Sequence, residues 1–326
     1  MPPGGERRGG GNGGFRDERR PRVKVAVTGA TGVIGRSAVA ELVAAGHEVV
    51  GLARTPEKAE LLRSLGATPR VGRLGDQDFL VDLFSGADAI ANLATHVPVG
   101  FAGARPGAWR SNDRLRTDGV RRVVEAARLA GVRRVVQESV SFLYADQGDT
   151  WVTEGSPLDI TRATEPASVA EAQVQDYVCD SRVGVVLRFG FIVGNDPMTC
   201  WQLKAAHQGR SIGSGDPDGW LHPVHTDDLG TAVVAGLTAP SGVYNVGAEP
   251  VRRADYVQAF ADAVGRTSLS FMSPLLTRLA GGRAEPMTRS LRVCSDHFTA
   301  STGWTPSRGR LDASWLHNLA VTQVLR

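Results

Sequence analysis

The feature that most constrains this chain is a glycine-rich segment, Thr28-Gly-Ala-Thr-Gly-Val-Ile-Gly35, between an apolar run and a helical pattern. In a strand–turn–helix of this kind, Gly29 allows the tight turn, Gly32 lets a ligand approach the backbone, and Gly35 lets the helix pack on the strand. The first amides of the helix and its dipole favour phosphate groups. We therefore expect one set of residues to hold the pyrophosphate of a dinucleotide: Gly29, Thr31, Gly32, Val33, Ile34 and Gly35.

Short apolar runs alternate with helical patterns up to residue 190, and this alternation predicts an α/β fold. Because both helices and strands recur, we expect a doubly wound parallel sheet of the Rossmann-like type. The strand patterns are at 23–28, 47–53, 69–71, 87–94, 133–139 and 184–188. The helix patterns are at 33–45, 56–65, 112–130 and 167–182, and Asp76 is placed to cap a further helix that ends near 84.

After residue 190 the pattern loosens, which predicts a smaller C-terminal substrate lobe at the carboxyl ends of the strands. Helix patterns follow at 203–208, 226–237 and 254–264, with a strand pattern at 242–246. The expected division is a dinucleotide-binding domain at 23–190 and a substrate lobe at 191–326. Parts of the lobe's helices are expected to return to the main domain.

Residues 1–22 are rich in Gly and Arg with almost nothing apolar, which predicts a disordered tail. The six arginines and three acidic residues of this segment account for the formal net charge of +3, so the rest of the chain is close to neutral. A neutral body lacks the basic surface that binds a phosphate backbone, and we expect no nucleic-acid partner. The sequence has no apolar stretch that suits a membrane span.

Three isolated cysteines, Cys179, Cys200 and Cys294, suit a reducing compartment, which predicts a cytoplasmic protein. His222 and His225 have no recognisable third ligand, so we expect no metal site. The expected partner is a small-molecule substrate, and the sequence is compatible with a homodimer.

Further segments resemble, in the right order, those of the extended short-chain dehydrogenase/reductases, the NAD(P)-dependent epimerase/dehydratase family. They are 87–94, 134–144, 186–188, His222-Pro-Val-His-Thr-Asp-Asp-Leu229, Tyr244-Asn-Val-Gly247 and Gly303-Trp-Thr-Pro306. With the glycine motif, the resemblance covers about residues 23–320. It implies that Leu93 and Ala94, at the end of the fourth strand, lie over the adenosine ribose and that Ser139 lies beside the nicotinamide.

The end of the second strand decides between the two nicotinamide cofactors. An NAD site places an acidic residue there, whereas this chain has Arg54, which would pair with a 2′-phosphate. We therefore expect NADP(H) rather than NAD(H), with a solvated arginine as the alternative. Where the family's third strand gives an Asp to the adenine, this chain has Arg73, followed by Leu74. We place both in the cofactor site, where Arg73 would stack on the adenine or bind phosphate, again with a solvated surface role as the alternative.

The family's Tyr-x-x-x-Lys pair does not carry over to this chain. The helix before the sixth strand has no lysine, and Tyr177 lies late, at an apolar position that predicts a core role. Val140 stands at the usual serine position, and Asp118 replaces an Asn that often supports the site. A tyrosine with a pKa of about 10 is a poor base near neutrality without a lysine beside it.

Catalysis would then depend on loops at the strand ends, and we name four candidates: His96, Ser139, Ser141 and Tyr144. The leading hypothesis is an NADP(H)-binding enzyme that reduces, dehydrates or epimerises a small organic substrate. The alternatives are a non-redox isomerase or lyase on the same fold, and a non-catalytic NADP(H)-sensing protein. The missing tyrosine–lysine pair favours the alternatives, whereas polar side chains in the loops favour an enzyme.

Overall fold

A computed structural model describes residues 22–273 and 282–324, so the predicted tail lies outside the described residues except for Arg22. The centre of the molecule is a seven-stranded sheet in which every neighbouring pair is parallel. In spatial order its strands are β11 (Gly242–Val246), β7 (Val183–Phe189), β5 (Arg134–Val140), β4 (Ala89–Asn92), β1 (Lys24–Thr28), β2 (Glu48–Ala53) and β3 (Thr68–Val71). The predicted α/β fold of Rossmann-like type is confirmed.

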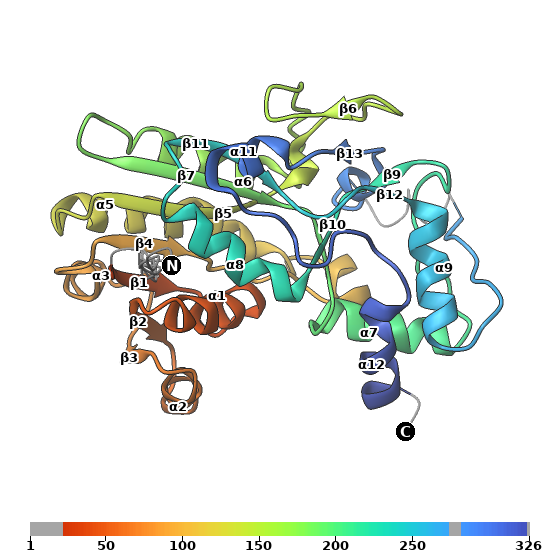
Figure 1. Ribbon diagram of the computed structural model, residues 1–326, viewed down its shortest axis with the longest axis horizontal. Coiled ribbons are helices and arrows are strands. Elements are labelled where there is room, and N and C mark those ends of the chain that lie inside the picture. Colours follow the sequence, from red (N-terminus) through yellow and green to blue (C-terminus); the bar gives the residue numbers. More distant parts are fainter. Residues whose placement is uncertain (1–21, 274–281, 325–326) are drawn as a thin grey trace, which may run out of the picture.

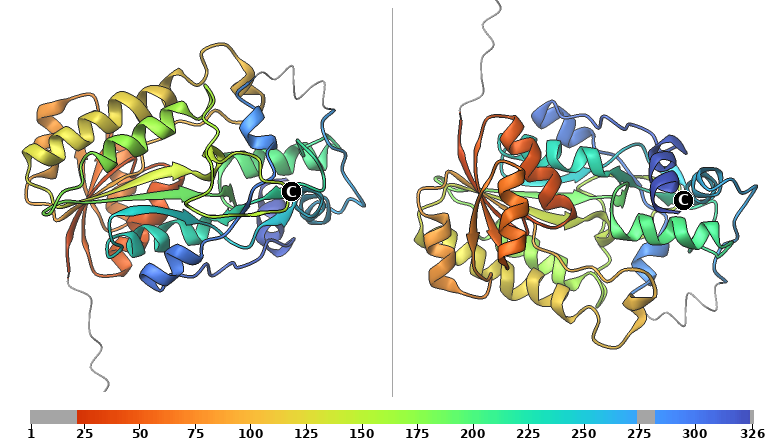
Figure 2. Two further views of the ribbon diagram at one scale, coloured as in Figure 1. Left: turned by 90° about the horizontal axis from the view of Figure 1, so that it is seen from above. Right: turned by 90° about the horizontal axis from the view of Figure 1, so that it is seen from below.

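Helices cover both faces of this sheet (Figures 1 and 2). One face carries α1 (Val33–Ala44), α2 (Pro56–Ser64) and α8 (Thr226–Gly236), which share an apolar core with the sheet. The other face carries α3 (Gln77–Phe84), α5 (Val120–Leu129) and α6 (Glu165–Gln175) over a second core. Asp76 caps α3 as predicted, because its carboxylate accepts a hydrogen bond from the Phe79 N–H at 3.1 Å.

The strand order reverses between β1 and β4, because β2 and β3 lie on one side of β1 and β4, β5, β7 and β11 on the other. Thr28 pairs with Asn92 at the carboxyl ends of β1 and β4, so the turns that follow both strands start side by side. Ligands bind at such a switch point in open α/β sheets. The fold therefore places the glycine turn and the residues after β4 at one site.

A second group of elements lies beyond the carboxyl ends of the strands, on the right of Figure 1. Its helices α7 (Pro197–His207), α9 (Arg253–Ala263) and α12 (Ser314–Gln323) share an apolar core of their own. Short strand pairs join it to the sheet: β8 (Phe191–Val193) with β10 (Pro223–His225), β9 (Trp220–Leu221) with β12 (Val251–Arg252), and β6 (Trp151–Val152) with β13 (Arg292–Val293). α11 (Asp296–Thr302) lies near β11.

Two segments from the C-terminal half complete the main domain. The predicted strand at 242–246 exists, and as β11 it is the edge strand of the main sheet beside β7. Helix α8 packs closely on α1, because a Cβ added at Gly230 would lie only 2.3 Å from the Ser37 carbonyl oxygen. The proposed division at residue 190 stays a prediction.

The structure corrects the end of one predicted helix. The pattern at 167–182 forms α6, which ends at Gln175 rather than near residue 182. Tyr177 is fully buried as expected, and its hydroxyl donates a hydrogen bond to the Val132 carbonyl. A backbone hydrogen-bonded turn between Cys179 and Arg182 then leads into β7. The helix stops where weak helix formers begin, Asp-Tyr-Val-Cys-Asp-Ser at 176–181, and the buried tyrosine just beyond its end is anchored to a distant loop.

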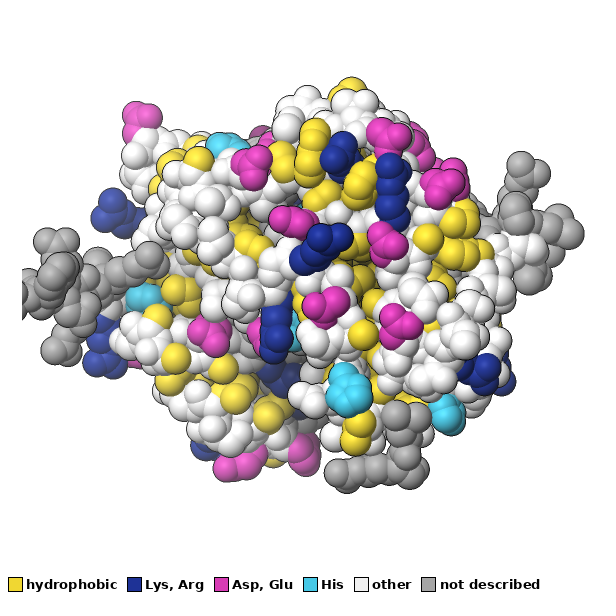
Figure 3. Space-filling view, turned by 45° about the vertical axis from the view of Figure 1, so that its right-hand side comes forward, with side chains coloured by type: hydrophobic (Ala, Val, Ile, Leu, Met, Phe, Trp, Pro, Cys, Tyr) yellow, Lys and Arg dark blue, Asp and Glu magenta, His cyan; other side chains and the backbone are white. Residues whose placement is uncertain are grey.

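Within the described ranges, no helix combines the length and apolar content that crossing a membrane requires. On the face seen in Figure 3, basic and acidic side chains are interspersed rather than gathered in a patch of one sign. That face therefore has no surface of the kind that binds a phosphate backbone.

Candidate functional site

The glycine turn after β1 has a geometry that only glycine allows. Gly29 has a φ of +66°, and a Cβ there would lie 2.4 Å from the Leu93 carbonyl oxygen. A Cβ at Gly35 would lie 2.1 Å from the Gly29 carbonyl oxygen. The Gly32 N–H closes the turn on the Gly29 carbonyl at 2.9 Å. The turn therefore brings the start of α1 directly against the end of β4.

The N-terminus of α1 is open to an anion. Gly32 is the N-cap and provides no side chain to cap the first amides, and the first turn has no acidic residue. Thr31 and Val33 are half-buried beside the turn, while Ile34 is buried in the core and fixes the helix. The amides and the positive end of the helix dipole are therefore available to a phosphate group.

The neighbouring strand ends are held by a buried chain of polar side chains. Thr28 donates to the Asn92 side-chain oxygen, and Asn92 donates to Gln137 at 2.7 Å. This chain joins β1, β4 and β5 across the switch point. Leu93 is buried and Ala94 is half-buried immediately above it, where the sequence placed the adenosine ribose.

Two arginines follow the neighbouring strands β2 and β3. Ala53 pairs with Val71, and Arg54 and Arg73 come one and two residues later, so both lie at the same edge of the sheet. Both side chains are exposed, and neither forms an ion pair with a described residue. Leu74 packs toward α5, because a Cβ at Gly119 would lie 2.7 Å from its side chain. This edge of the sheet therefore carries two exposed guanidinium groups.

Ser139, at the end of β5, belongs to a buried charge cluster. Its hydroxyl donates to Glu171 of α6 at 2.5 Å. Arg188 of β7 donates two hydrogen bonds to the same carboxylate, at 2.9 and 2.6 Å. All three side chains are buried, so the serine hydroxyl is already committed to a carboxylate partner.

Ser141 and Tyr144 follow in the 3₁₀ turn after β5 and are also buried. The Ser141 hydroxyl has no hydrogen-bond partner in the described part of the chain. The Tyr144 hydroxyl donates to Asn245 at 2.7 Å, and the Arg188 guanidinium lies 4.9 Å from its ring centre. Burial raises the pKa of Tyr144, so this hydroxyl is neutral near pH 7.

His96 lies in the exposed loop after β4, where its backbone N–H donates to the Asn112 side-chain oxygen at 3.1 Å. Among the described residues, no side-chain hydrogen bond joins any two of the four catalytic candidates. Ser139, Ser141 and Tyr144 share one end of β5, whereas His96 stands apart with an accessible ring.

Sequence reasoning missed the arginine partner of Glu138. Arg116 and Glu138 form a buried ion pair with an N···O distance of 2.6 Å, and both side chains are about 95% buried. Burial raises the pKa of Glu138, and the coulombic attraction of Arg116 opposes that rise. The available signal was Glu138 itself, an acidic residue within a predicted strand.

The described part of the chain contains no tyrosine–lysine pair at this site. Helix α6 contains neither residue type, and the lysines Lys24, Lys58 and Lys204 lie on other elements. Burial raises the pKa of Tyr177, whose hydroxyl donates to the Val132 carbonyl just before the amino end of β5. In the described ranges, no group of three or more His, Cys, Asp or Glu residues is arranged to hold a metal ion.

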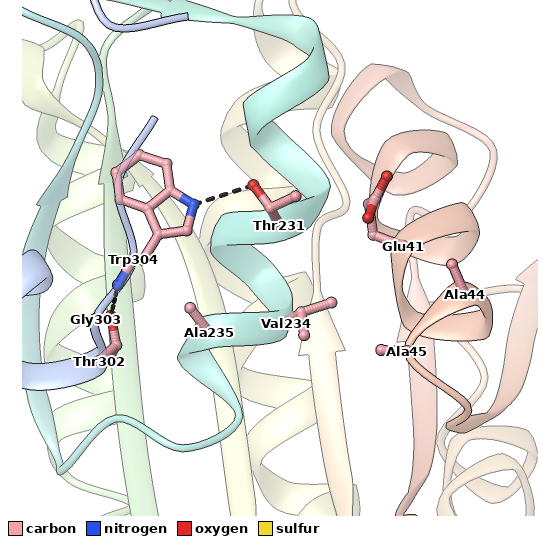
Figure 4. A pocket seen from close by; sticks show the side chains of 9 residues that line it. All are labelled: Glu41, Ala44, Ala45, Thr231, Val234, Ala235, Thr302, Gly303 and Trp304. Carbon is pink, nitrogen blue, oxygen red and sulfur yellow. Dashed lines mark hydrogen bonds between the residues drawn. The ribbon is translucent and has the colours of Figure 1, made fainter. Parts of the chain in front are cut away.

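Figure 4 shows a surface hollow between α1, α8 and the 302–304 segment, in which the Trp304 indole N–H donates to the Thr231 hydroxyl at 3.0 Å. Near the C-terminal end of α1 it is lined by Glu41, Ala44 and the C-cap residue Ala45. These residues lie at the opposite end of α1 from Gly32, which a rise of about 1.5 Å per residue puts roughly 15 Å away. This hollow is therefore not the dinucleotide site.

Residues 29–200 match the family model described as NAD(P)H-binding. The 3-diazoavenalumate denitrifying reductase of a Streptomyces species is 30% identical to this chain, over 87% of this chain and 96% of its own length. The UDP-glucose 4-epimerase of Streptomyces lividans is 30% identical over 48% of this chain and 46% of its own.

Two solved structures share the fold. MoeE5 in complex with UDP-glucose and NAD has a TM-score of 0.72 at 23% identity, covering 93% of this chain and 97% of that one. The human epimerase family protein SDR39U1 with NADPH has a TM-score of 0.74 at 22% identity, covering 91% and 99%. The chain belongs to the NAD(P)H-binding family, and its resemblance to the extended short-chain dehydrogenase/reductases is confirmed.

Proposed function

We propose that this chain is an NADP(H)-dependent reductase that transfers hydride to a small organic electrophile without taking a proton from a tyrosine–lysine pair. The observation that carries the proposal is the state of two tyrosines, Tyr144 after the carboxyl end of β5 and Tyr177 near the amino end of the same strand. Tyr144 and Tyr177 are buried, both hydroxyls donate to protein oxygens, and burial raises both pKa values. A neutral, committed hydroxyl with no lysine beside it is poorly suited to proton relay.

The preference for NADP(H) is supported by charge at one edge of the sheet. Arg54 and Arg73 both follow strands that pair in parallel, so a 2′-phosphate there would meet two guanidinium groups. The glycine turn and the open amides of α1 suit the pyrophosphate. When bound, the cofactor supplies the hydride, and the chain's own residues orient it at the ends of β4 and β5.

Hydride transfer to an arenediazonium ion is a reaction that needs no proton. The hydride forms the new C–H bond, the C–N bond breaks with both electrons leaving on nitrogen, and N₂ departs as a neutral molecule. The products are the arene, N₂ and the oxidised cofactor, so charge and atoms balance. The printed name of the Streptomyces relative, a denitrifying reductase of a diazo compound, supports this substrate class for the present chain.

The candidate residues then take different roles. Ser139, Ser141 and Tyr144 shape the rigid, buried wall at the end of β5 beside the nicotinamide. His96 has the accessible side chain, so we propose that it contacts the substrate. Free Cys179, Cys200 and Cys294 support a cytoplasmic location, and a homodimer stays a prediction that light scattering can test.

The proposal is tested with NADPH deuterated at C4, supplied as both stereoisomers, and 4-carboxybenzenediazonium as the probe. We expect one stereoisomer to transfer deuterium to the ring carbon that loses nitrogen, with one N₂ released per NADPH oxidised. A reaction without protein gives the background rate. Tight NADPH binding without deuterium transfer to this probe would contradict the proposal and favour an NADP(H)-sensing protein.

A further inference from the structure

The buried ion pair between Arg116 and Glu138 lies close to the switch point of the sheet. Glu138 comes one residue after Gln137, the last residue of β5 that pairs with β4. Arg116 reaches it from the helical segment that follows the β4 loop, and one hydrogen bond of 2.6 Å joins the two charges. The ion pair therefore links the helical segment that follows the β4 loop to the carboxyl end of β5.

The backbone around Arg116 is built to bring this side chain inward. The helix between β4 and β5 starts as α4 (Arg110–Arg114), widens into a π-helical turn at Leu115–Gly119 and continues as α5. A π-helical turn shifts the register of the residues that follow it and is often found at functional sites. Here the turn contains a buried arginine, 5% exposed, on a helix whose other arginines are exposed or half-buried.

The contact between Arg116 and Glu138 uses only part of the hydrogen-bonding capacity of the two groups. In the described part of the chain, Nη1 of Arg116 and Oε2 of Glu138 have no hydrogen-bond partner. The nearby charges, Glu171 and Arg188, neutralise each other in a separate two-bond contact. Buried charges are weakly screened, so each member of the Arg116–Glu138 pair acts on a charge that forms next to it.

We propose that Arg116 and Glu138 are positioning residues that set the relative affinity of the site for the oxidised and reduced nicotinamide cofactor. The proposal rests on the proposed function, which places the nicotinamide at the ends of β4 and β5. The oxidised ring carries a positive charge that the reduced ring lacks. Glu138 therefore favours the oxidised form, Arg116 favours the reduced form, and the intact pair balances the two.

The test measures the dissociation constants of NADP⁺ and NADPH for the full chain, by calorimetry or by the fluorescence of bound NADPH, at pH 8. Glu138→Gln leaves Arg116 unbalanced, so the ratio of the NADP⁺ constant to the NADPH constant should rise on the order of tenfold. Arg116→Gln should move the ratio in the opposite direction. The double variant should return it to the wild-type value, because both charges are then absent.

A purely structural role of the ion pair would not change this ratio, because a distorted site would lose affinity for both forms of the cofactor to the same extent. Glu125→Gln is the matched control, since Glu125 pairs with Arg121 on the exposed side of α5. Unchanged ratios in all three variants, with lowered melting temperatures, would overturn the proposal. If the wild-type chain binds neither dinucleotide, it is the proposed function that fails. Should Glu138→Gln not fold, the double variant and Arg116→Gln still decide the question.

Discussion

We predict that His222 makes the free energy of unfolding fall as the pH falls below neutral. Substituting His222 should remove this contribution. The imidazole is buried between two glycines, because a Cβ at Gly247 would lie 2.1 Å from its Nε2 and one at Gly190 would lie 2.9 Å from its Nδ1. Neither ring nitrogen has a hydrogen-bond partner among the described residues. Burial lowers the pKa of His222 from 6.5 to about 3.

The sign of the effect follows from that shift. The unfolded chain binds a proton near pH 6.5, whereas the folded chain does not until about pH 3, so stability is lost as pH falls through this window. For one such histidine, the free energy of unfolding should fall by about 1.4 kcal/mol between neutral pH and pH 5.5, and by about 2 kcal/mol at pH 5.0.

The variant His222→Leu removes the titrating group and the two unpartnered nitrogens. Urea denaturation of both proteins at pH 7.5, 6.5, 5.5 and 5.0 should show the variant losing about 2 kcal/mol less than wild type over the range. His207→Gln, at an exposed position of α7, is the control and should keep the wild-type slope. Parallel losses in wild type and His222→Leu would refute the reasoning, because His222 would then titrate alike in the folded and unfolded chains.

Three further predictions concern the site. Arg54→Ala should weaken NADPH binding by about tenfold to a hundredfold and leave NADH binding unchanged, whereas Arg63→Ala should affect neither in calorimetric titrations; equal losses for both cofactors would remove the basis for NADP(H) preference. His96→Ala should lower kcat/KM by about tenfold and leave the NADPH dissociation constant unchanged. If kcat/KM instead falls by ~10²–10⁴ and its pH dependence changes, His96 is a proton donor. Gly35→Val should abolish cofactor binding or folding, since its side chain would overlap the Gly29 carbonyl, and normal NADPH affinity in this variant would contradict the turn geometry.

Local signals predicted the elements that the structure contains. The glycine turn, the strand β2 and the cap at Asp76 each depend on residues within a few positions of one another. The contact of Tyr177 beyond the end of α6 could not be predicted in this way, because its hydroxyl is held by Val132, 45 residues away. Residues 176–181, Asp-Tyr-Val-Cys-Asp-Ser, are weak helix formers, so local propensity also disfavours a longer helix, but it does not identify the distant partner of the tyrosine.

The ion pair between Arg116 and Glu138 could not be predicted for a related reason. Arg116 and Glu138 are 22 residues apart, and only the path of the chain through the π-helical turn brings them together. In the sequence, Arg116 is one of several arginines in the helix pattern at 112–130, and nothing local marks it as the partner of Glu138. The four catalytic candidates are predicted from their positions after strand ends. Position along the chain does not show which of these side chains already form hydrogen bonds within the protein.

The placement of α8 and β11 has a consequence for how the chain is synthesised. The apolar stripe of α1 and the edge of β7 are covered only when residues 226–246 have left the ribosome. Translation proceeds at ~5–20 residues per second. For a few seconds after residue 190 is added, the edge of β7 and the apolar stripe of α1 are therefore exposed in the N-terminal half of the chain. A fragment cut at residue 190 should therefore aggregate rather than act as a portable cofactor module, and the nascent chain needs its C-terminal half before its N-terminal half is finished.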